Sequence, residues 1–103
     1  MHNVKVFPKY TDYLAQKLED PEFAADYKRA TIKTRFALDL SRAREARGMT
    51  QGELAEITKT KQPMLSRYER GQMPEVPSLQ RIAAALHARI TIGADGSLSV
   101  DLV

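Results

Sequence analysis

The sequence predicts a mainly α-helical protein of five or so helices that ends in a short β-hairpin. Apolar residues recur at helical spacing along most of the chain, as they do at Phe36, Leu40 and Ala43. Near the middle, capping signals mark two short helices separated by only a few residues. Beyond them, in the last part of the chain, apolar residues alternate around an Asp-Gly turn, which is typical of two paired strands.

Composition narrows the classes of protein to consider. A chain of 103 residues has room for one domain and an extension. No apolar run approaches the ~20 residues of a transmembrane helix, and the first ten residues do not resemble a secretory signal. The absence of cysteine excludes disulfides and thiolate metal sites, and it fits a reducing cytoplasm. We therefore expect a cytoplasmic protein with no membrane segment.

The first third of the chain, residues 1–33, is expected to precede the main domain as a helical extension. Within it, residues 1–9 are predicted to be an extended lead and residues 12–19 a short helix. The apolar residues of the extension recur at helical spacing, and they are Tyr13, Leu14, Leu18, Phe23 and Tyr27. A loose, solvent-exposed arm would not need so many apolar residues. They should therefore cover either this chain's own core or a partner's groove.

Two longer helices are predicted before the middle of the chain. Asp20-Pro21-Glu22 marks the start of the first, with an N-cap, a proline and an acid in the usual order. Whether this helix continues through residues 30–32 is left open, because β-branched residues loosen helices. The next helix is predicted over residues 34–47, and Gly48 is its expected C-terminal stop.

The strongest local signal lies in the middle of the chain. Thr50 is a favourable N-cap, and Glu53 three residues later completes a capping box. A helix is therefore predicted from Gln51 to about Thr58, followed by a turn at residues 59–61. A second helix is predicted from about Gln62, ending at a glycine cap. Two short helices with so short a turn form a helix-turn-helix.

The exposed face of the second predicted helix carries side chains suited to DNA. Gln62 and Arg67 are of the types that hydrogen-bond base edges bidentately in the major groove. Lys59, Lys61 and Arg70 flank them and suit phosphates. From spacing alone, an ordinary solvated face is about equally expected. With Gln51 at the N-terminus of the first helix, the candidate DNA-binding residues are Gln51, Lys59, Lys61, Gln62, Pro63, Met64, Arg67 and Arg70.

Basic residues also gather upstream of this motif. Residues 28–47 contain seven of them against two acidic residues, and the sequence pI is about 9.3. Such a stripe suggests a polyanion partner, although a solvated helix face is the commoner explanation. The basic residues of this stripe are Lys28, Arg29, Lys33, Arg35, Arg42, Arg44 and Arg47.

The last part of the chain is predicted to contain a helix ending near Leu86 and then a hairpin over residues 88–103. The buried stripe of the helix should be Val76, Leu79, Ile82, Ala83 and Leu86. His87 is expected as a helix-end residue rather than a metal ligand. An isolated two-stranded hairpin is marginal in water, so it needs a partner surface: its own helices, a second subunit or another protein.

No pattern of catalytic residues is recognisable. The sequence lacks a Gly-rich phosphate loop, a Cys/His cluster and a Ser-His-Asp arrangement with plausible spacing. Its two histidines are His2 and His87, far apart in sequence. We therefore expect no enzymatic activity, no cofactor and no metal site.

The middle of the chain resembles the helix-turn-helix of the Xre/Cro/C1 repressor family. The matching letters are T-Q-x-E-L-A at residues 50–55 and Q-x-x-L-S-R-Y-E-R-G at residues 62–71. With its flanks, the resemblance covers about residues 36–86. It implies a lambda-repressor-like core, within residues 34–87, that binds double-stranded DNA. The chain departs from the family pattern at Lys59, which replaces the usual glycine, so a left-handed backbone is expected there.

The extension adds a resemblance to HigA-type antitoxins. The letters L-x-D-P-E-F occur at residues 18–23, and a tail of the family's kind, A-L-H-A-R-I-T-I, occurs at residues 85–92. This resemblance implies a protein that neutralises a HigB-type ribonuclease toxin by direct binding. It also implies that the protein represses its own operon as a homodimer on a near-palindromic operator. The candidate toxin-binding residues are then Tyr13, Leu14, Leu18, Phe23 and Tyr27.

Three functions remain open. The first is a DNA-binding antitoxin and autorepressor, and the second is a stand-alone Xre-family transcriptional repressor without a toxin partner. The third is a protein-binding module whose helix-turn-helix no longer binds DNA, but the presence of Gln62 and Arg67 argues against it. A neighbouring reading frame for a small basic ribonuclease-like protein would favour the first over the second. The extension itself has one alternative role, as an extra helical layer on the domain.

Overall fold

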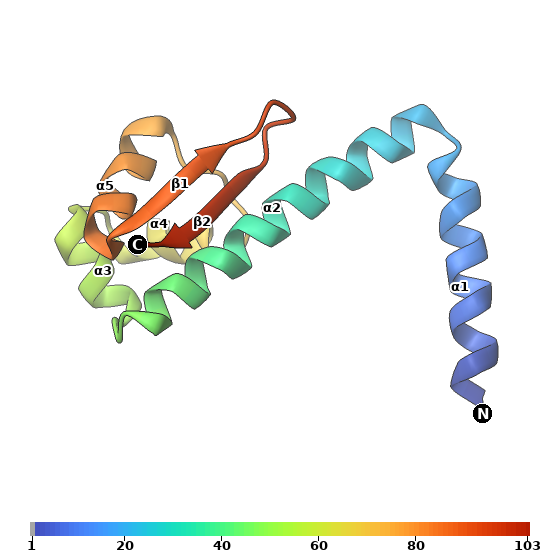
Figure 1. Cartoon of the computed structure of the whole chain (residues 1–103), viewed down its shortest axis with the longest axis horizontal. Coiled ribbons are helices and arrows are strands. Elements are labelled where there is room, and N and C mark those ends of the chain that lie inside the picture. The colour runs from blue at the N-terminus through green and yellow to red at the C-terminus, as the bar shows by residue number, and fades with distance from the viewer. Residues whose placement is uncertain (1) are drawn as a thin grey trace. The chain divides into compact units, whose positions relative to one another are not determined.

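The structure, a computed structural model, describes residues 2–103, with side chains from residue 10 onward. Its elements are α1 (His2–Leu18), α2 (Pro21–Ala46), α3 (Gln51–Thr58), α4 (Gln62–Tyr68), α5 (Val76–Leu86), β1 (Ala88–Ile92) and β2 (Leu98–Leu102) (Figure 1). The predicted mainly α fold with a C-terminal hairpin is confirmed. The chain divides into two compact units, residues 1–31 and residues 32–103.

The N-terminal unit consists of α1 and the first turns of α2. The extended lead predicted for residues 1–9 is wrong, because residues 2–9 belong to α1; residue 1 lies outside the described residues. Val4 and Phe7 are three residues apart, a spacing that places them on one face of a helix but on opposite faces of a strand. The predicted second start is confirmed, since the Asp20 carboxylate accepts a hydrogen bond from the Glu22 backbone N–H at 3.0 Å.

α2 continues through residues 30–32 without a break, which answers the question that the sequence left open. The Thr31 hydroxyl donates a hydrogen bond to the Tyr27 carbonyl one turn earlier, at 2.9 Å. This bond satisfies the threonine hydroxyl within the helix. As predicted, the helix stops just before Gly48, whose φ of 70° lies in the left-handed region.

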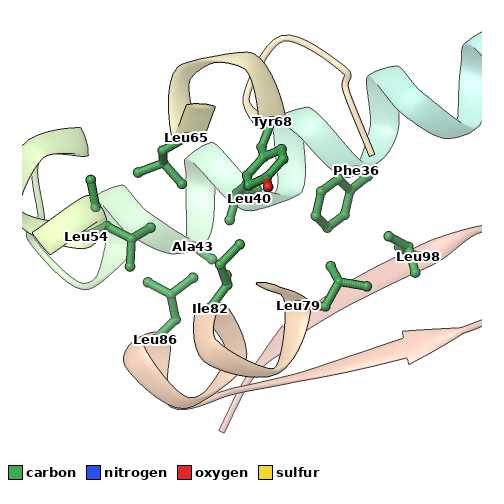
Figure 2. Packing of buried hydrophobic residues seen from close by; sticks show 11 residues of the cluster. Phe36, Leu40, Ala43, Leu54, Leu65, Tyr68, Leu79, Ile82, Leu86 and Leu98 are labelled. Carbon is green, nitrogen blue, oxygen red and sulfur yellow. The ribbon is translucent and has the colours of Figure 1, made fainter. Parts of the chain in front are cut away.

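The core of the unit at residues 32–103 lies between four helices and the hairpin. Figure 2 shows that side chains from α2, α4 and α5 turn toward one another there. The predicted burial of Val76 is wrong, since this first residue of α5 is 54% exposed, and Ala83 is only half-buried. The cluster comprises Phe36, Leu40, Ala43, Leu54, Ala55, Leu65, Tyr68, Leu79, Ile82, Leu86 and Leu98.

α3 and α4 form the predicted helix-turn-helix. The Thr50 hydroxyl accepts a hydrogen bond from the Glu53 N–H at 3.1 Å, and the Glu53 carboxylate accepts one from the Thr50 N–H at 2.9 Å. The hydrogen bond from the Thr50 backbone N–H is the main cause that lowers the pKa of the Glu53 carboxyl, and the Thr50 side chain adds to the effect. Lys59 caps α3 with the expected left-handed backbone, at φ 56°. The second helix ends at Tyr68, earlier than predicted, and Gly71 lies in the following turn at φ 115°.

The hairpin packs against the same core. Its two strands pair antiparallel over five residues each, from Ala88 opposite Leu102 to Ile92 opposite Leu98. The predicted turn is confirmed between the strands, where the Gly96 N–H donates to the Gly93 carbonyl at 3.0 Å and Gly96 has φ 87°. Because Leu98 is buried in the cluster, one partner surface of the hairpin is the core of its own unit.

Two arginines bind backbone carbonyls at helix ends and at the end of the hairpin. Arg47 donates from Nε to the Leu86 carbonyl at 2.8 Å, and from Nη2 to the carbonyls of His87 and Val103, both at 3.1 Å. Arg81 donates from Nε to the Thr58 carbonyl at 3.0 Å. Cations at these positions stabilise helices. His87 is the expected helix-end residue, with φ at 49°.

The capping box generates the first prediction, for Thr50→Ala. Losing the hydroxyl leaves the Glu53 N–H without its partner, and Thr50 is exposed, so no core packing changes. We expect the free energy of unfolding, measured in urea, to fall by ~1 kcal/mol with an unchanged m-value. Thr50→Ser keeps the acceptor and should restore most of that loss. Equal stabilities for the alanine and serine variants would contradict the prediction.

Candidate nucleic-acid interface

α4 is a short helix with one buried and one exposed side. Leu65 and Tyr68 lie in the core, at 0% and 7% exposure, and hold the helix in place. Gln62, Pro63 and Arg67 are exposed on the other side. The sequence predicted this division from spacing, and a rigid helix with polar side chains on its free side is a suitable reading element for a DNA groove.

Basic side chains flank this exposed side. Lys59 and Lys61 are exposed in the turn, and Lys61 occupies the N-cap of α4 without making a side-chain cap. Arg70 is exposed beyond the helix and donates a hydrogen bond to the Ser66 hydroxyl at 3.0 Å. These three side chains are therefore available at both ends of α4, as phosphate contacts require.

The N-termini of α3 and α4 lie against each other. A Cβ added at Gly52 would meet the Gln62 side chain, with its Oε1 at 3.5 Å. Gln51, next to Gly52, is half-buried and donates from Nε2 to Glu69 Oε1 at 3.1 Å. The structure therefore places Gln62, proposed to read base edges, beside Gly52 at the start of α3, one residue from Gln51.

Glu69 joins α2 to both motif helices. Arg44 forms a two-pronged ion pair with it, from Nε to Oε2 at 2.7 Å and from Nη2 to Oε1 at 3.0 Å. Glu69 Oε1 also accepts from the Ser41 hydroxyl at 2.8 Å, and Arg44 Nη1 donates to the Met49 carbonyl at 2.7 Å. The side chains of Arg44 and Glu69 are only 14% and 5% exposed. Sequence analysis missed this pair as the support of the interface, because its partners lie 25 residues apart.

These contacts determine the charge state of the pair. Burial raises the pKa of Glu69, but hydrogen bonds from Arg44, Gln51 and Ser41, with the charge of Arg44, outweigh burial and leave the pKa below its ordinary value of 4.5. The hydrogen bond to Glu69 raises the pKa of Arg44. Both groups are therefore charged at neutral pH, and Gln51 is held by a carboxylate rather than by a carboxylic acid.

Gln72 is a further exposed amide at this surface that the sequence did not single out. It donates from Nε2 to the sulfur of Met64 at 3.6 Å, which places it beside the half-buried third residue of α4. Its backbone N–H donates to the Arg67 carbonyl at 3.0 Å. Gly71 is the sequence feature that could have identified Gln72. A glycine after a helix marks a reversal of the chain, and the reversal brings the next residue back beside that helix.

The basic stripe on α2 is largely engaged within the protein. Arg44 and Arg47 hold Glu69 and helix-end carbonyls, as described above. Arg29 pairs with Asp26, and Arg35 Nε lies 3.5 Å from Asp39 Oδ1. Lys33 and Arg42 are exposed. Most arginines of this stripe therefore either support the fold or form solvent-exposed ion pairs with neighbours on the same helix.

The candidate toxin-binding residues all belong to the unit at residues 1–31. Tyr13 and Tyr27 are 58% and 41% exposed, whereas Leu14, Leu18 and Phe23 are half-buried. The rings of Phe23 and Tyr27 stack with centroids 6.3 Å apart. The Lys17 ammonium lies 5.6 Å from the centre of the Tyr13 ring. These residues therefore belong to a unit distinct from the helix-turn-helix, with one aromatic pair on α2 and one exposed tyrosine on α1.

The part of the chain that the structure describes contains neither a metal-ion cluster nor a membrane-spanning helix. No group of three or more His, Asp or Glu side chains there could hold a metal ion. None of the helices in residues 2–103 combines the length and hydropathy of a membrane span.

The buried ion pair generates a prediction for Glu69→Gln. The change leaves Arg44 without its countercharge, so the free energy of unfolding at pH 7 should fall by roughly 3 kcal/mol, as when one partner of a buried pair is removed. Because the folded pKa of Glu69 is lowered, its contribution is complete above the ordinary value of 4.5 and is lost as the pH falls through the folded pKa.

Urea unfolding across a pH series measures this contribution as the stability difference between wild type and Glu69→Gln. The difference should be constant near neutral pH and shrink once the pH falls below 4.5. Glu53→Gln is the control, because the Glu53 carboxylate is exposed. The stability difference between wild type and Glu53→Gln should change much less as the pH falls. A difference for Glu69→Gln that grows toward acid pH would contradict the assignment.

Comparison with known proteins agrees with this geometry. A family model described as Helix-turn-helix matches residues 40–91, which is half of the chain and covers α3, α4 and α5. No curated protein and no solved structure matches the chain significantly. The match includes the capping box, the turn at Lys59 and the exposed side of α4. The chain therefore belongs to the helix-turn-helix family of the Xre/Cro/C1 type, whose domains are DNA-binding regulators.

Proposed function

We propose that this chain is a sequence-specific autorepressor that also serves as the antitoxin of a HigB-type ribonuclease toxin. The observation that carries the DNA-binding half is the exposed side of α4, where Gln62 and Arg67 face outward from a helix anchored by Leu65 and Tyr68. A glutamine and an arginine at such positions match the donor and acceptor patterns of adenine and guanine in the major groove.

The proposed contacts divide into two kinds. Gln62 and Arg67 read base edges, whereas Lys59, Lys61 and Arg70 neutralise phosphates on either side. Gln51, whose amide already bonds to Glu69, positions the start of α3 on the backbone. Gln72 beside Met64 adds an amide at the same surface. This arrangement supports specific binding with a strong dependence on salt.

The antitoxin half of the proposal rests on the N-terminal unit. Within the L-x-D-P-E-F segment, the Asp20 carboxylate accepts the Glu22 N–H at the start of α2, and the stacked rings of Phe23 and Tyr27 follow along that helix. Tyr13 and Tyr27 are large side chains more than a third exposed. Aromatic side chains of this kind serve as anchors in protein interfaces. We infer that they enter an apolar groove of the toxin.

Arg67→Ala tests the DNA-binding half. We expect the affinity for DNA upstream of the chain's own reading frame to fall by ~1–3 kcal/mol, or about 5- to 150-fold, in a gel-shift titration. Discrimination against changed bases should be lost at the position that Arg67 reads. Arg35→Ala removes the same charge from α2, where the arginine pairs with Asp39, and should leave affinity within about twofold.

Lys61→Ala distinguishes a phosphate contact from a base contact. It should weaken binding to all sequences similarly and flatten the dependence of log affinity on log salt by about one unit. Unchanged affinity for Arg67→Ala would refute the assignment of α4, and it would favour the reading as a protein-binding module.

The toxin surface is tested with Tyr13→Ala combined with Tyr27→Ala in the full chain. We expect this double variant to lose rescue of growth when the toxin encoded next to it is co-expressed, because two exposed anchors are removed. Binding to the operator should be unchanged. Leu38→Ala is the control, since Leu38 is similarly exposed, at 44%, but belongs to the unit at residues 32–103.

Full rescue by the double variant would place the toxin surface on the helix-turn-helix unit or the hairpin. Absence of any toxin-like reading frame beside the gene would favour the stand-alone repressor. In that case the DNA-binding predictions for Arg67 and Lys61 stand unchanged.

A further inference from the structure

The turn that follows α4 lies against the middle of α2. A Cβ added at Gly71 would lie 3.8 Å from the Cβ of Lys33, so the two backbones approach closely at this point. Figure 2 shows the contact that brings them together, since the Tyr68 ring at the end of α4 turns toward Phe36 and Leu40 of α2. Lys33 is therefore held beside the end of α4, although it belongs to a helix outside the helix-turn-helix.

A groove between α2 and the end of α4 adjoins this contact. It has a volume of about 260 Å³. The hydroxyl-bearing residues of α2 and the first two residues after α4 make up most of its walls. Its lining residues are Thr34, Ala37, Leu38, Ser41, Glu69 and Arg70. One side of α2 and the residues that follow α4 therefore form a continuous surface.

Lys33 and Arg70 are two exposed cations that the fold holds beside the same turn. Neither forms an ion pair among the residues whose side chains the structure describes. Arg70 donates to the uncharged Ser66 hydroxyl at 3.0 Å, and the charge of Glu69 is already compensated by Arg44. Because like charges repel, an anion placed between Lys33 and Arg70 would be attracted by both.

We propose that Lys33 and Arg70 together bind a backbone phosphate of DNA at this turn, so that α2 contributes to the DNA-binding surface. The inference rests on the proposed function, in which α4 enters the major groove and Arg70 at its end meets the backbone. The flexible four-carbon stem of Lys33 carries its ammonium group to the same strand. Such a contact fixes the orientation of α4 on the duplex and carries no sequence information.

The proposal separates the basic residues of α2 by the side of the helix on which they lie. Lys33 and Arg42 are both exposed, and they are nine positions apart in the sequence. Nine positions correspond to two and a half turns of an α-helix, so the two residues lie on opposite sides of α2. Arg42 lines a different groove, beside β2. It is therefore a matched control for the charge of Lys33.

The test measures how the full chain binds a short duplex of arbitrary sequence, by fluorescence anisotropy over a series of salt concentrations. Lys33→Ala should bind about fivefold to tenfold more weakly near 0.1 M salt, and its slope of log affinity against log salt should be flatter by about one unit. Arg42→Ala should keep the wild-type slope and an affinity within about twofold of wild type. Lys33→Arg keeps the charge and should also keep the slope.

Replacing single phosphates by neutral methylphosphonates locates the contact. In duplexes with the DNA found upstream of the chain's reading frame, one backbone position should weaken the binding of wild type and of Arg42→Ala by about fivefold. The same substitution should leave the binding of Lys33→Ala unchanged, because that contact is already lost. A purely structural role of Lys33 would not produce a loss at one backbone position.

Equal salt slopes for Lys33→Ala and Arg42→Ala would overturn the inference. If the slopes are equal and millimolar inorganic phosphate shifts the amide resonances of Lys33 and Gly71 without DNA, the site binds a free anion and the assignment to DNA is wrong. A wild type that binds no duplex refutes the repressor and this contact with it. A wild type that loses affinity through Arg67→Ala but not through Lys33→Ala refutes this contact alone.

Discussion

The buried pair of Arg44 and Glu69 is the interaction on which the helix-turn-helix depends. One carboxylate binds α2 through Arg44 and Ser41, and it binds the start of α3 through Gln51. Arg44 closes the set by binding the Met49 carbonyl just before the capping box. Burying two charges is costly, and only complete hydrogen bonding offsets that cost. The pair therefore demands one relative placement of the three helices, whereas apolar contacts alone would tolerate small shifts.

The elements that could be predicted are those determined by local chemistry. Thr50, Lys59 and the Asp-Gly turn each act within four residues, so the sequence alone located the motif and the hairpin. The helical state of residues 2–9 was missed because a short alternation does not distinguish a strand from a helix. Val76 was misjudged because its spacing fits the stripe while its position precedes the packed part of α5. Glu69 and Gln72 depend on tertiary contacts that no spacing rule contains.

The arginines of this chain show why composition was a weaker guide than position. The basic stripe on α2 indicated a polyanion surface, yet Arg44 and Arg47 bind a carboxylate and backbone carbonyls inside their own unit. Most of the residues proposed to contact DNA come instead from a segment of mixed charge around α4. The planar guanidinium group, with its several donors, can bind groups inside the protein or groups on DNA. Only the folded structure therefore shows whether a given arginine has a structural role or a recognition role.

Lys59 holds a left-handed backbone at φ 56°, a conformation that costs a non-glycine residue roughly 1 kcal/mol or more. Glycine would adopt it without that strain. The chain thus carries strain at the turn while placing a cation beside the proposed recognition helix. Such a position is a trade-off between stability and activity. Replacing Lys59 by glycine would be one route to a more stable protein, but that protein would bind polyanions less well.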